Sequence, residues 1–283
     1  MSDALKAILS QAIKEDAPNG DITTSLLISE DFTVRTSLIA KKTGVFYGEE
    51  VIVELWPLLD PSVMVSLYKK NGSPLIPNDI ISDIHGSIKH ILLGERVMLN
   101  LVQRLSGIAT LTRRFVDALD TPAIKILDTR KTTPLFRFLE KKAVKAGGGE
   151  NHRDSLSDMV LIKDNHLAHL KKHGFLKSLP QLLAHFRKSH PTIKIEVEVT
   201  SLEQIQEWDL RDADYILLDN FPIHSIEKAV QICRAKGYGS EIEVSGNITL
   251  ETIPLYRKLP IQRISVGALT HSAPALDLSL EYI

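Results

Sequence analysis

The sequence is poor in cysteine, in unbalanced charge and in long apolar runs. Its single cysteine, Cys233, excludes a disulfide framework within the chain and a cysteine-based metal site, and we expect it to be a small packed residue. Lys and Arg number 34 against 35 Asp and Glu, which argues against proteins that bind nucleic acids or membrane surfaces through a basic excess. No apolar run approaches the roughly 20 residues of a membrane-spanning helix. We therefore expect a soluble, cytoplasmic protein with neither a nucleic-acid nor a membrane partner.

The first third of the chain mixes helical and strand patterns. Apolar residues of the segment 1–16 recur on one helical face, which predicts an amphipathic helix rather than a signal peptide. A strand is predicted at 33–40 and a helix at 49–56. A long apolar-periodic stretch at 95–119 predicts another helix, and Gly107 inside it favours a break or kink there.

From residue 123 onward, short β-branched runs alternate regularly with helical stretches. The six runs are 123–127, 159–162, 193–199, 215–218, 241–244 and 263–266. Strands separated by helices imply right-handed βαβ units and a parallel sheet. Six units indicate a barrel of the TIM type, complete or incomplete, and a doubly wound open sheet is the alternative that periodicity leaves open.

Polar residues or glycine follow each of these predicted strands. They are Asp128 and Arg130, Lys163 and Asp164, Glu198, Asp219 and Asn220, Ser245 and Gly246, and Gly267. In a parallel barrel the carboxyl ends of all strands meet on one face, where the loops build the active site. Residues scattered along the sequence are therefore predicted to line one pocket, although any single one of them could be only a turn or helix cap.

Five cationic or potentially cationic residues fall within this part of the chain: Arg130, Lys131, His152, Arg153 and Lys163. Such a group would repel itself unless an anion normally lies among its members. Arginine binds carboxylates in a bidentate manner, and lysine supplies a compact charge. The predicted ligand is a small molecule with two or more carboxylates or phosphates. For each residue taken alone, a surface salt bridge is the simpler explanation.

Glu198 and Asp219 end two consecutive predicted strands and suit Mg²⁺, which takes one or two protein carboxylates together with substrate oxygens. The alternative is that one of them pairs with Lys163, and both can hold in different ligand states. The small residues at 245–247 and 266–268 follow the last two strands, where TIM-type barrels commonly bind a phosphate.

The glycine run 147–149 has two explanations: a helix C-cap and loop, or a loop that a ligand approaches closely. It lies three residues before His152 and Arg153.

Taken in order, the sequence motifs resemble one family over nearly the whole chain. The motifs are GDITT (20–24), ERVMLNLVQRLSGIAT (95–110), DTRKTTP (128–134), KAVKAGGGENHR (142–153), LIKDNH (161–166), EVEV (196–199), LLDN (217–220), SGN (245–247) and VGALTHS (266–272). They look like those of quinolinate phosphoribosyltransferase, also called carboxylating nicotinate-nucleotide pyrophosphorylase. The resemblance implies a type II phosphoribosyltransferase-like α/β fold. An N-terminal α/β sandwich at 1–105, with the tail 273–283, would join an open TIM-like α/β barrel at 106–272.

The resemblance also implies an activity: Mg²⁺-dependent transfer of phosphoribosyl from phosphoribosyl pyrophosphate to quinolinate with decarboxylation, giving nicotinate mononucleotide for NAD synthesis. It implies a homodimer, alone or within a higher oligomer, whose pockets each borrow Arg96 from the neighbouring subunit. Quinolinate would be held by Arg130, Lys131, His152, Arg153 and Lys163. Phosphoribosyl pyrophosphate, directly or through Mg²⁺, would be held by Glu198, Asp219, Ser245, Gly246, Asn247, Gly267 and His271. Lys131 and Lys163 are the candidates for protonating the carbanion left by decarboxylation.

Two positions depart from the family pattern. Leu135 stands where glycine is usual, and Asp154 adds a negative charge beside the predicted carboxylate site. Neither departure removes a predicted ligand. Two rival functions remain: a same-fold paralogue with another acceptor substrate, and a catalytically silent anion-binding protein.

Overall fold

The computed structural model describes residues 2–283, which divide into two compact units. The first unit holds the chain up to Arg113 together with Lys145–Gly148 and Ala273–Ile283. The second unit holds Arg114–Val144 and Gly149–Ser272. Among the described residues, no helix combines the length and apolar character needed to cross a membrane.

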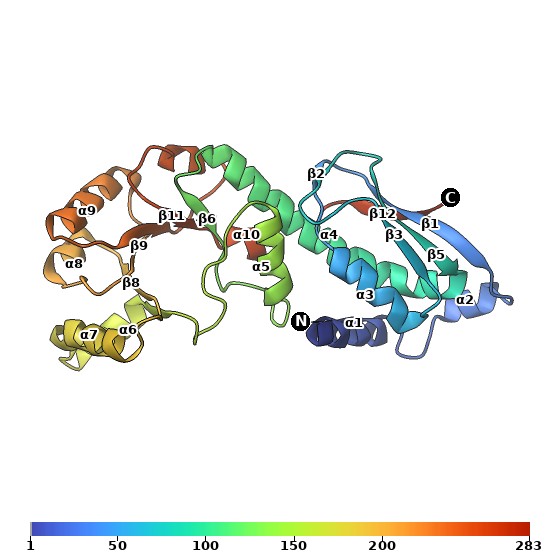
Figure 1. Ribbon diagram of the computed structural model, residues 1–283, viewed down its shortest axis with the longest axis horizontal. Helices are drawn as coiled ribbons and strands as arrows, with labels where there is room; N and C mark the ends of the chain where they lie inside the picture. The colour runs from blue at the N-terminus through green and yellow to red at the C-terminus, as the bar shows by residue number, and fades with distance from the viewer. Residues whose placement is uncertain (1) are drawn as a thin grey trace. The chain divides into compact units, whose positions relative to one another are not determined.

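The first unit is built on an antiparallel sheet with the strand order β12-β1-β5-β3 (Figure 1). These strands are β1 (Thr33–Ala40), β3 (Met64–Leu67), β5 (Ile80–Ser87) and β12 (Leu278–Tyr282), and a separate pair joins β2 (Gly44–Val45) to β4 (Pro74–Leu75). The helices are α1 (Ser2–Asp16), α2 (Ile22–Leu27) and α3 (Glu49–Leu59), with the long α4 (Ile88–Leu119) leading out of the unit. Trp56 and Phe46 are fully buried in its core. The predicted N-terminal helix, the strand at 33–40 and the helix at 49–56 are confirmed.

Helix α4 is continuous through Gly107, so the predicted break at this glycine is wrong. The reason for a glycine lies in tertiary packing instead. A Cβ atom at position 107 would lie 2.0 Å from the carbonyl oxygen of Pro274, because the C-terminal segment crosses the helix there. The glycine permits this close approach and the helix continues past it.

The second unit contains a six-stranded parallel sheet with the order β6-β11-β10-β9-β8-β7 (Figure 1). Its strands are β6 (Lys125–Leu127), β7 (Val160–Ile162), β8 (Ile195–Val199), β9 (Tyr215–Asp219), β10 (Glu241–Ser245) and β11 (Arg263–Ser265). Its helices are α5 (Arg137–Ala146), α6 (Asp164–Lys172), η1 (Leu176–Ser178), α7 (Leu179–Ser189), α8 (Leu202–Glu207), α9 (Ile223–Ala235), η2 (Ile253–Tyr256) and α10 (Ala268–His271). All six predicted strands are present.

The strand order distinguishes between the two predicted architectures. Strands β7 to β11 are neighbours in chain order and β6 lies beside β11, so the sheet winds in one direction without reversal. A doubly wound sheet would reverse its order at a switch point. Because β6 and β7 are the two edges, the barrel is open, as predicted. Along β8, Ile195, Val197 and Val199 alternate with Glu196 and Glu198, so the two glutamates share one face of the sheet.

Candidate functional site

The carboxyl ends of the parallel strands carry the residues that the sequence singles out. Arg130 and Lys131 follow β6 and Lys163 follows β7. Glu198 lies near the end of β8, and Asp219 ends β9. At the ends of the last two strands lie Ser245, Gly246, Asn247 and Gly267. Parallel pairing of all six strands brings these positions to the same edge of the sheet.

Glu198 and Asp219 form the acidic side of this edge, and Lys163 lies beside Glu198. The Nζ atom of Lys163 lies 3.9 Å from Oε2 of Glu198, a loose ion pair with a half-exposed lysine. Burial raises the pKa of Glu198, and the charge of Asp219 adds to the increase while Lys163 opposes it. Oδ2 of Asp219 accepts a hydrogen bond of 2.7 Å from Asn220. Two interacting carboxylates beside a half-exposed lysine fit both alternatives: a Lys163 pair, or hard oxygen ligands for Mg²⁺.

In the loops after β10 and β11, a glycine lies very close to side chains of neighbouring residues. Gly246 has φ +101°, and a Cβ atom there would lie 2.2 Å from Oδ1 of Asn220. The same Asn220 oxygen accepts a 3.1 Å hydrogen bond from Asn247. A Cβ atom on Gly267 would lie 3.1 Å from both Cδ of Lys131 and Nε2 of His271. Lys131 and His271 therefore flank Gly267, which groups two candidate binding residues with a small-residue loop.

Arg130 and Arg153 lie near each other and are both partly buried. Burial lowers the pKa of Arg153, and the charge of Arg130 lowers it further. The Nη1 atom of Arg153 donates a 3.0 Å hydrogen bond to the carbonyl of Met159. Within residues 2–283, the buried Nε of Arg130 has no hydrogen-bond partner. Two neighbouring guanidinium groups with unused donors suit a ligand that carries carboxylates.

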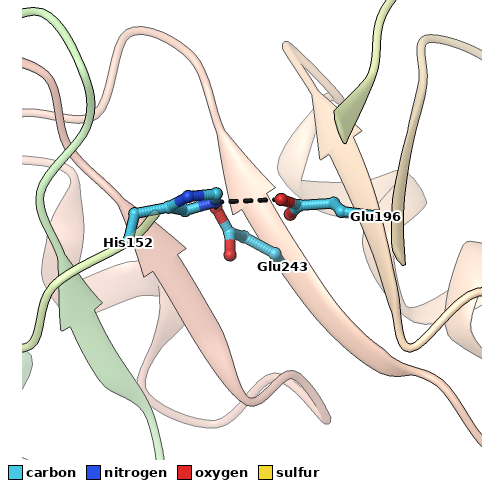
Figure 2. Close-up of side chains that lie close together, drawn as sticks. All are labelled: His152, Glu196 and Glu243. Atoms are coloured by element: carbon cyan, nitrogen blue, oxygen red, sulfur yellow. Dashed lines mark ion pairs between the residues drawn. The ribbon is translucent and has the colours of Figure 1, made fainter. Parts of the chain in front are cut away.

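His152 lies deeper, with only 7% of its side chain exposed. Its Nε2 atom lies 3.0 Å from Oε2 of Glu196 and 3.3 Å from Oε1 of Glu243, two carboxylates that are fully buried (Figure 2). The sequence patterns do not single out these glutamates. A signal was present, however, because the IEVEV alternation places Glu196 on the same face as Glu198, and two charges in a buried strand need partners.

The protonation of this cluster is set by burial and by the closeness of its charged groups. Burial alone would lower the pKa of His152, but Glu196 and Glu243 raise it to about 9. Burial and the charge of Glu243 raise the pKa of Glu196. Nδ1 of His152 accepts a 2.8 Å hydrogen bond from the N–H of Arg153, which requires the neutral, Nε2-protonated ring. The raised pKa therefore belongs to the cluster of His152, Glu196 and Glu243 as a whole rather than to the ring alone.

The same tautomer decides against a metal ion at this cluster. Nε2 and two carboxylate oxygens lie within 4.8 Å of one another, a spacing that would suit a cation. A metal ion bound to Nε2 would need the lone pair of that nitrogen. The ring proton would then lie on Nδ1, where it would face the N–H of Arg153. Arg263 already supplies positive charge, since its Nε donates a 2.8 Å hydrogen bond to Glu243.

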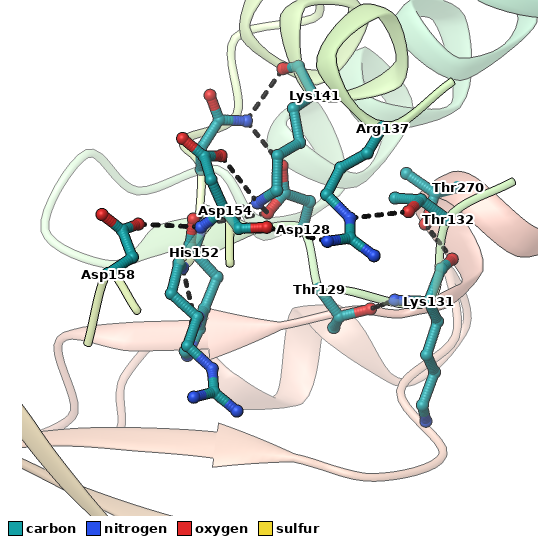
Figure 3. Close-up of polar contacts among 12 residues, drawn as sticks. Asp128, Thr129, Lys131, Thr132, Arg137, Lys141, His152, Asp154, Asp158 and Thr270 are labelled. Carbon is teal, nitrogen blue, oxygen red and sulfur yellow. Dashed lines mark hydrogen bonds and ion pairs between the residues drawn. The ribbon is translucent and has the colours of Figure 1, made fainter. Parts of the chain in front are cut away.

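The backbone of His152 is held from its other side by a buried ion pair (Figure 3). Nζ of Lys141 lies 2.6 Å from Oδ1 of Asp128, and both side chains are almost fully buried. Lys141 donates to the carbonyl of His152 at 2.9 Å, and Asp128 accepts the N–H of His152 at 2.9 Å. Oδ1 of Asp154 lies 3.6 Å from the same lysine. The negative charge by which Asp154 departs from the family pattern therefore faces a cation.

The other departure, Leu135, adopts φ +68° with 78% of its surface exposed. The loop therefore keeps the left-handed conformation that suits glycine and accepts the strain of a leucine.

Three further candidates lie outside the strand-end group. The glycine run follows α5 as a helix C-cap: Gly148 donates to the carbonyl of Lys145, and a Cβ atom on Gly147 would lie 2.3 Å from the carbonyl oxygen of Ala109. Arg96 is an exposed residue of α4 in the first unit. Cys233 is fully buried in α9, as predicted.

Comparison with known proteins places these features in one family. The family models described as quinolinate phosphoribosyl transferase, N-terminal and C-terminal domain, match residues 21–106 and 108–281. A probable carboxylating nicotinate-nucleotide pyrophosphorylase of Bacillus subtilis is 41% identical, covering 98% of this chain and 93% of that protein. A carboxylating nicotinate-nucleotide pyrophosphorylase of Mycobacterium leprae is 37% identical over 99% of this chain and 97% of its own. The crystal structure of NadC from Streptococcus pyogenes superposes with a TM-score of 0.89 at 38% identity, covering 100% of this chain and 99% of that one. The chain belongs to the quinolinate phosphoribosyltransferase family.

Proposed function

We propose that this protein transfers the phosphoribosyl group of phosphoribosyl pyrophosphate to the ring nitrogen of quinolinate and releases CO₂, giving nicotinate mononucleotide. The observation that carries the proposal is the pairing of the two arginines, Arg130 and Arg153, with an acidic side made by Glu198 and Asp219 at one edge of the barrel. Quinolinate has two carboxylates on adjacent ring carbons, and two arginines match that pair. Membership of the family supports the same substrates.

The first chemical step needs charge stabilisation on both sides of the ribose. The lone pair of the quinolinate nitrogen forms a bond to C1, the bond from C1 to the pyrophosphate oxygen breaks, and pyrophosphate leaves with the electron pair. Positive charge grows on the ribose in this step, and Glu198 or Asp219 would stabilise it electrostatically. His271, beside Gly267, would bind the 5′-phosphate side together with the loop at Ser245–Asn247.

The second step removes CO₂. The bond between C2 of the ring and its carboxylate breaks, and the electron pair stays on C2, where the quaternised ring nitrogen stabilises it. A proton then adds to C2. Lys163 and Lys131 are the candidate donors, since both are exposed ammonium groups at the strand-end edge. The protein contributes chiefly position and electrostatics.

We also propose that Mg²⁺ binds at Glu198 and Asp219. The two carboxylates interact and supply hard oxygen ligands, which is the donor set that Mg²⁺ takes beside substrate oxygens. When bound, the ion would neutralise the charge of the departing pyrophosphate.

A turnover assay tests the activity. The protein is incubated with quinolinate, phosphoribosyl pyrophosphate and Mg²⁺ while nicotinate mononucleotide and CO₂ are followed, with nicotinate as a parallel acceptor. We expect product and CO₂ in equal amounts, and a loss of about 10- to 100-fold in kcat/KM in Arg130→Ala and Lys163→Ala, as for one lost charge-assisted contact. Lys188→Ala is the control, because this exposed lysine lies in the last turn of α7, the helix that precedes β8, and so lies toward the opposite sheet edge. No turnover of quinolinate by folded protein would refute the proposal, and turnover of nicotinate alone would favour a same-fold paralogue.

We further propose a homodimer in which Arg96 of one subunit completes the quinolinate site of the other. An exposed arginine on the long helix α4 supports a role outside its own unit. The test mixes two impaired variants, Arg96→Ala and Lys163→Ala, under conditions that allow subunits to exchange. Mixed dimers would contain one intact site, so activity should return. No recovery despite proven exchange would place Arg96 in its own subunit's site or in none.

A further inference from the structure

A buried set of charged residues inside the barrel lies behind the proposed quinolinate site. It consists of Glu196 on β8, Glu243 on β10 and Arg263 on β11, here called the brace. The two glutamates face the ring of His152 (Figure 2), and Arg263 binds Glu243. Both glutamates are fully buried and Arg263 is 9% exposed. We infer that the brace positions Arg153 for quinolinate by fixing the ring of His152; this inference rests on the proposed function.

The brace is itself held rigidly. Nε of Arg263 donates a 2.8 Å hydrogen bond to Oε2 of Glu243, and its guanidinium carbon lies 3.9 Å from the ring centroid of Tyr215. The other oxygen of Glu243 lies 3.3 Å from Nε2 of His152. Strands β10 and β11 are hydrogen-bonded neighbours with Glu243 opposite Arg263. The contact to the histidine ring therefore starts from regular sheet structure rather than from a loop.

The ring of His152 links the brace to Arg153. Its Nε2 faces the two carboxylates, and its Nδ1 accepts the backbone N–H of Arg153 at 2.8 Å. Both ring nitrogens are thus engaged within the protein, which leaves His152 a positioning residue rather than a direct ligand of quinolinate. Because Arg153 comes immediately after it in the chain, a shift of the ring would move the start of the arginine side chain.

The opposite side of the same segment is held independently by Asp128 and Lys141, which bind the backbone N–H and carbonyl of His152. The backbone is therefore fixed without the brace, and the brace fixes the ring. A cluster of buried charges is costly, and apolar residues of similar volume are often as stable or more so. We explain these three buried charged side chains by the orientation that they impose on Arg153, the neighbouring binding residue.

The first test uses two nearly isosteric substitutions, Glu243→Gln and Glu196→Gln. Each leaves the shape intact but weakens the hold on the ring. We expect KM for quinolinate to rise about tenfold, while KM for phosphoribosyl pyrophosphate and kcat change by less than about twofold. Glu227→Gln is the control, because this exposed glutamate lies on α9, outside the sheet that carries the brace. An unchanged KM for quinolinate with only a lower melting temperature would overturn the inference, since that is the result of a structural role alone.

The second test asks whether the brace acts through Arg153. In an Arg153→Ala background, Glu243→Gln should raise KM for quinolinate no further, because the group that it positions is gone. Independent, multiplying effects would overturn the inference. If Arg153→Ala alone leaves KM unchanged, the assignment of Arg153 in the proposed function fails; if it raises KM and neither glutamine variant does, only the brace fails. Should Glu243→Gln not fold, Glu196→Gln enters the same cycle, since it meets the ring from the other strand.

Discussion

The backbone conformation of Leu135 allows a prediction of how glycine and alanine at this position differ in stability. Its φ of +68° lies in the left-handed region, which costs a residue with a Cβ atom about 1–2 kcal/mol. Glycine removes this cost but adds about 0.4–1 kcal/mol through the greater entropy of the unfolded chain. With 78% of the leucine exposed, little burial is lost on truncation. Leu135→Gly should therefore be more stable than Leu135→Ala by about 1 kcal/mol.

The comparison of glycine with alanine isolates the backbone, because both substitutions remove the same side chain. Leu156 provides the control: it is 70% exposed and is not among the residues with positive φ. There, glycine should be less stable than alanine by about 0.5–1 kcal/mol. Urea unfolding at fixed pH measures all four variants, and calorimetry should show a difference of about 2–4 °C per kcal/mol. A glycine variant at position 135 that is less stable than the alanine variant, by the same amount as at position 156, would refute the argument, since the left-handed conformation would then carry no cost.

Three further predictions concern buried or paired groups. Asp128→Ala should lower the free energy of unfolding by about 3–5 kcal/mol, because it removes the buried partner of the buried ammonium of Lys141. Asp154→Ala, which removes the exposed partner of the same lysine, should cost less than about 1 kcal/mol. Equal losses in urea unfolding would contradict this. Burial raises the pKa of the Cys233 thiol to about 11, so only about one part in a thousand is thiolate at pH 8. Ellman's reagent should therefore react with this thiol only as the protein unfolds. Rapid labelling of the folded protein would disprove this prediction. Burial raises the pKa of Asp214, but hydrogen bonds from two cationic side chains and a backbone N–H outweigh burial and lower it below 3.8. The ionised Asp214 therefore stabilises the folded protein above pH 3.8, and this stabilisation is lost as the pH falls through the lower pKa of the folded state. The urea midpoints of wild type and Asp214→Asn should converge in acid. Midpoints that stay apart would contradict the prediction.

Local sequence patterns were enough to predict the parallel strands and most of the polar residues at their ends. The alternation of β-branched runs with helical stretches is a local pattern, so all six parallel strands were predictable. Polar residues directly after strands, such as Lys163 and Asp219, were predictable as site candidates because parallel pairing brings every strand end to one edge. The domain limits and the role of Arg96 stay predictions.

The buried charges that meet inside the barrel can be recognised only in the folded chain. His152, Glu196 and Glu243 come from a loop and two non-adjacent strands, and no local pattern reports that their side chains converge. Gly107 shows the same limit in reverse: glycine in a helical pattern reads as a break, but the carbonyl of Pro274, far along the chain, explains it. Local periodicity comes from backbone geometry, whereas side-chain contacts depend on strand order and register, which only the folded chain sets.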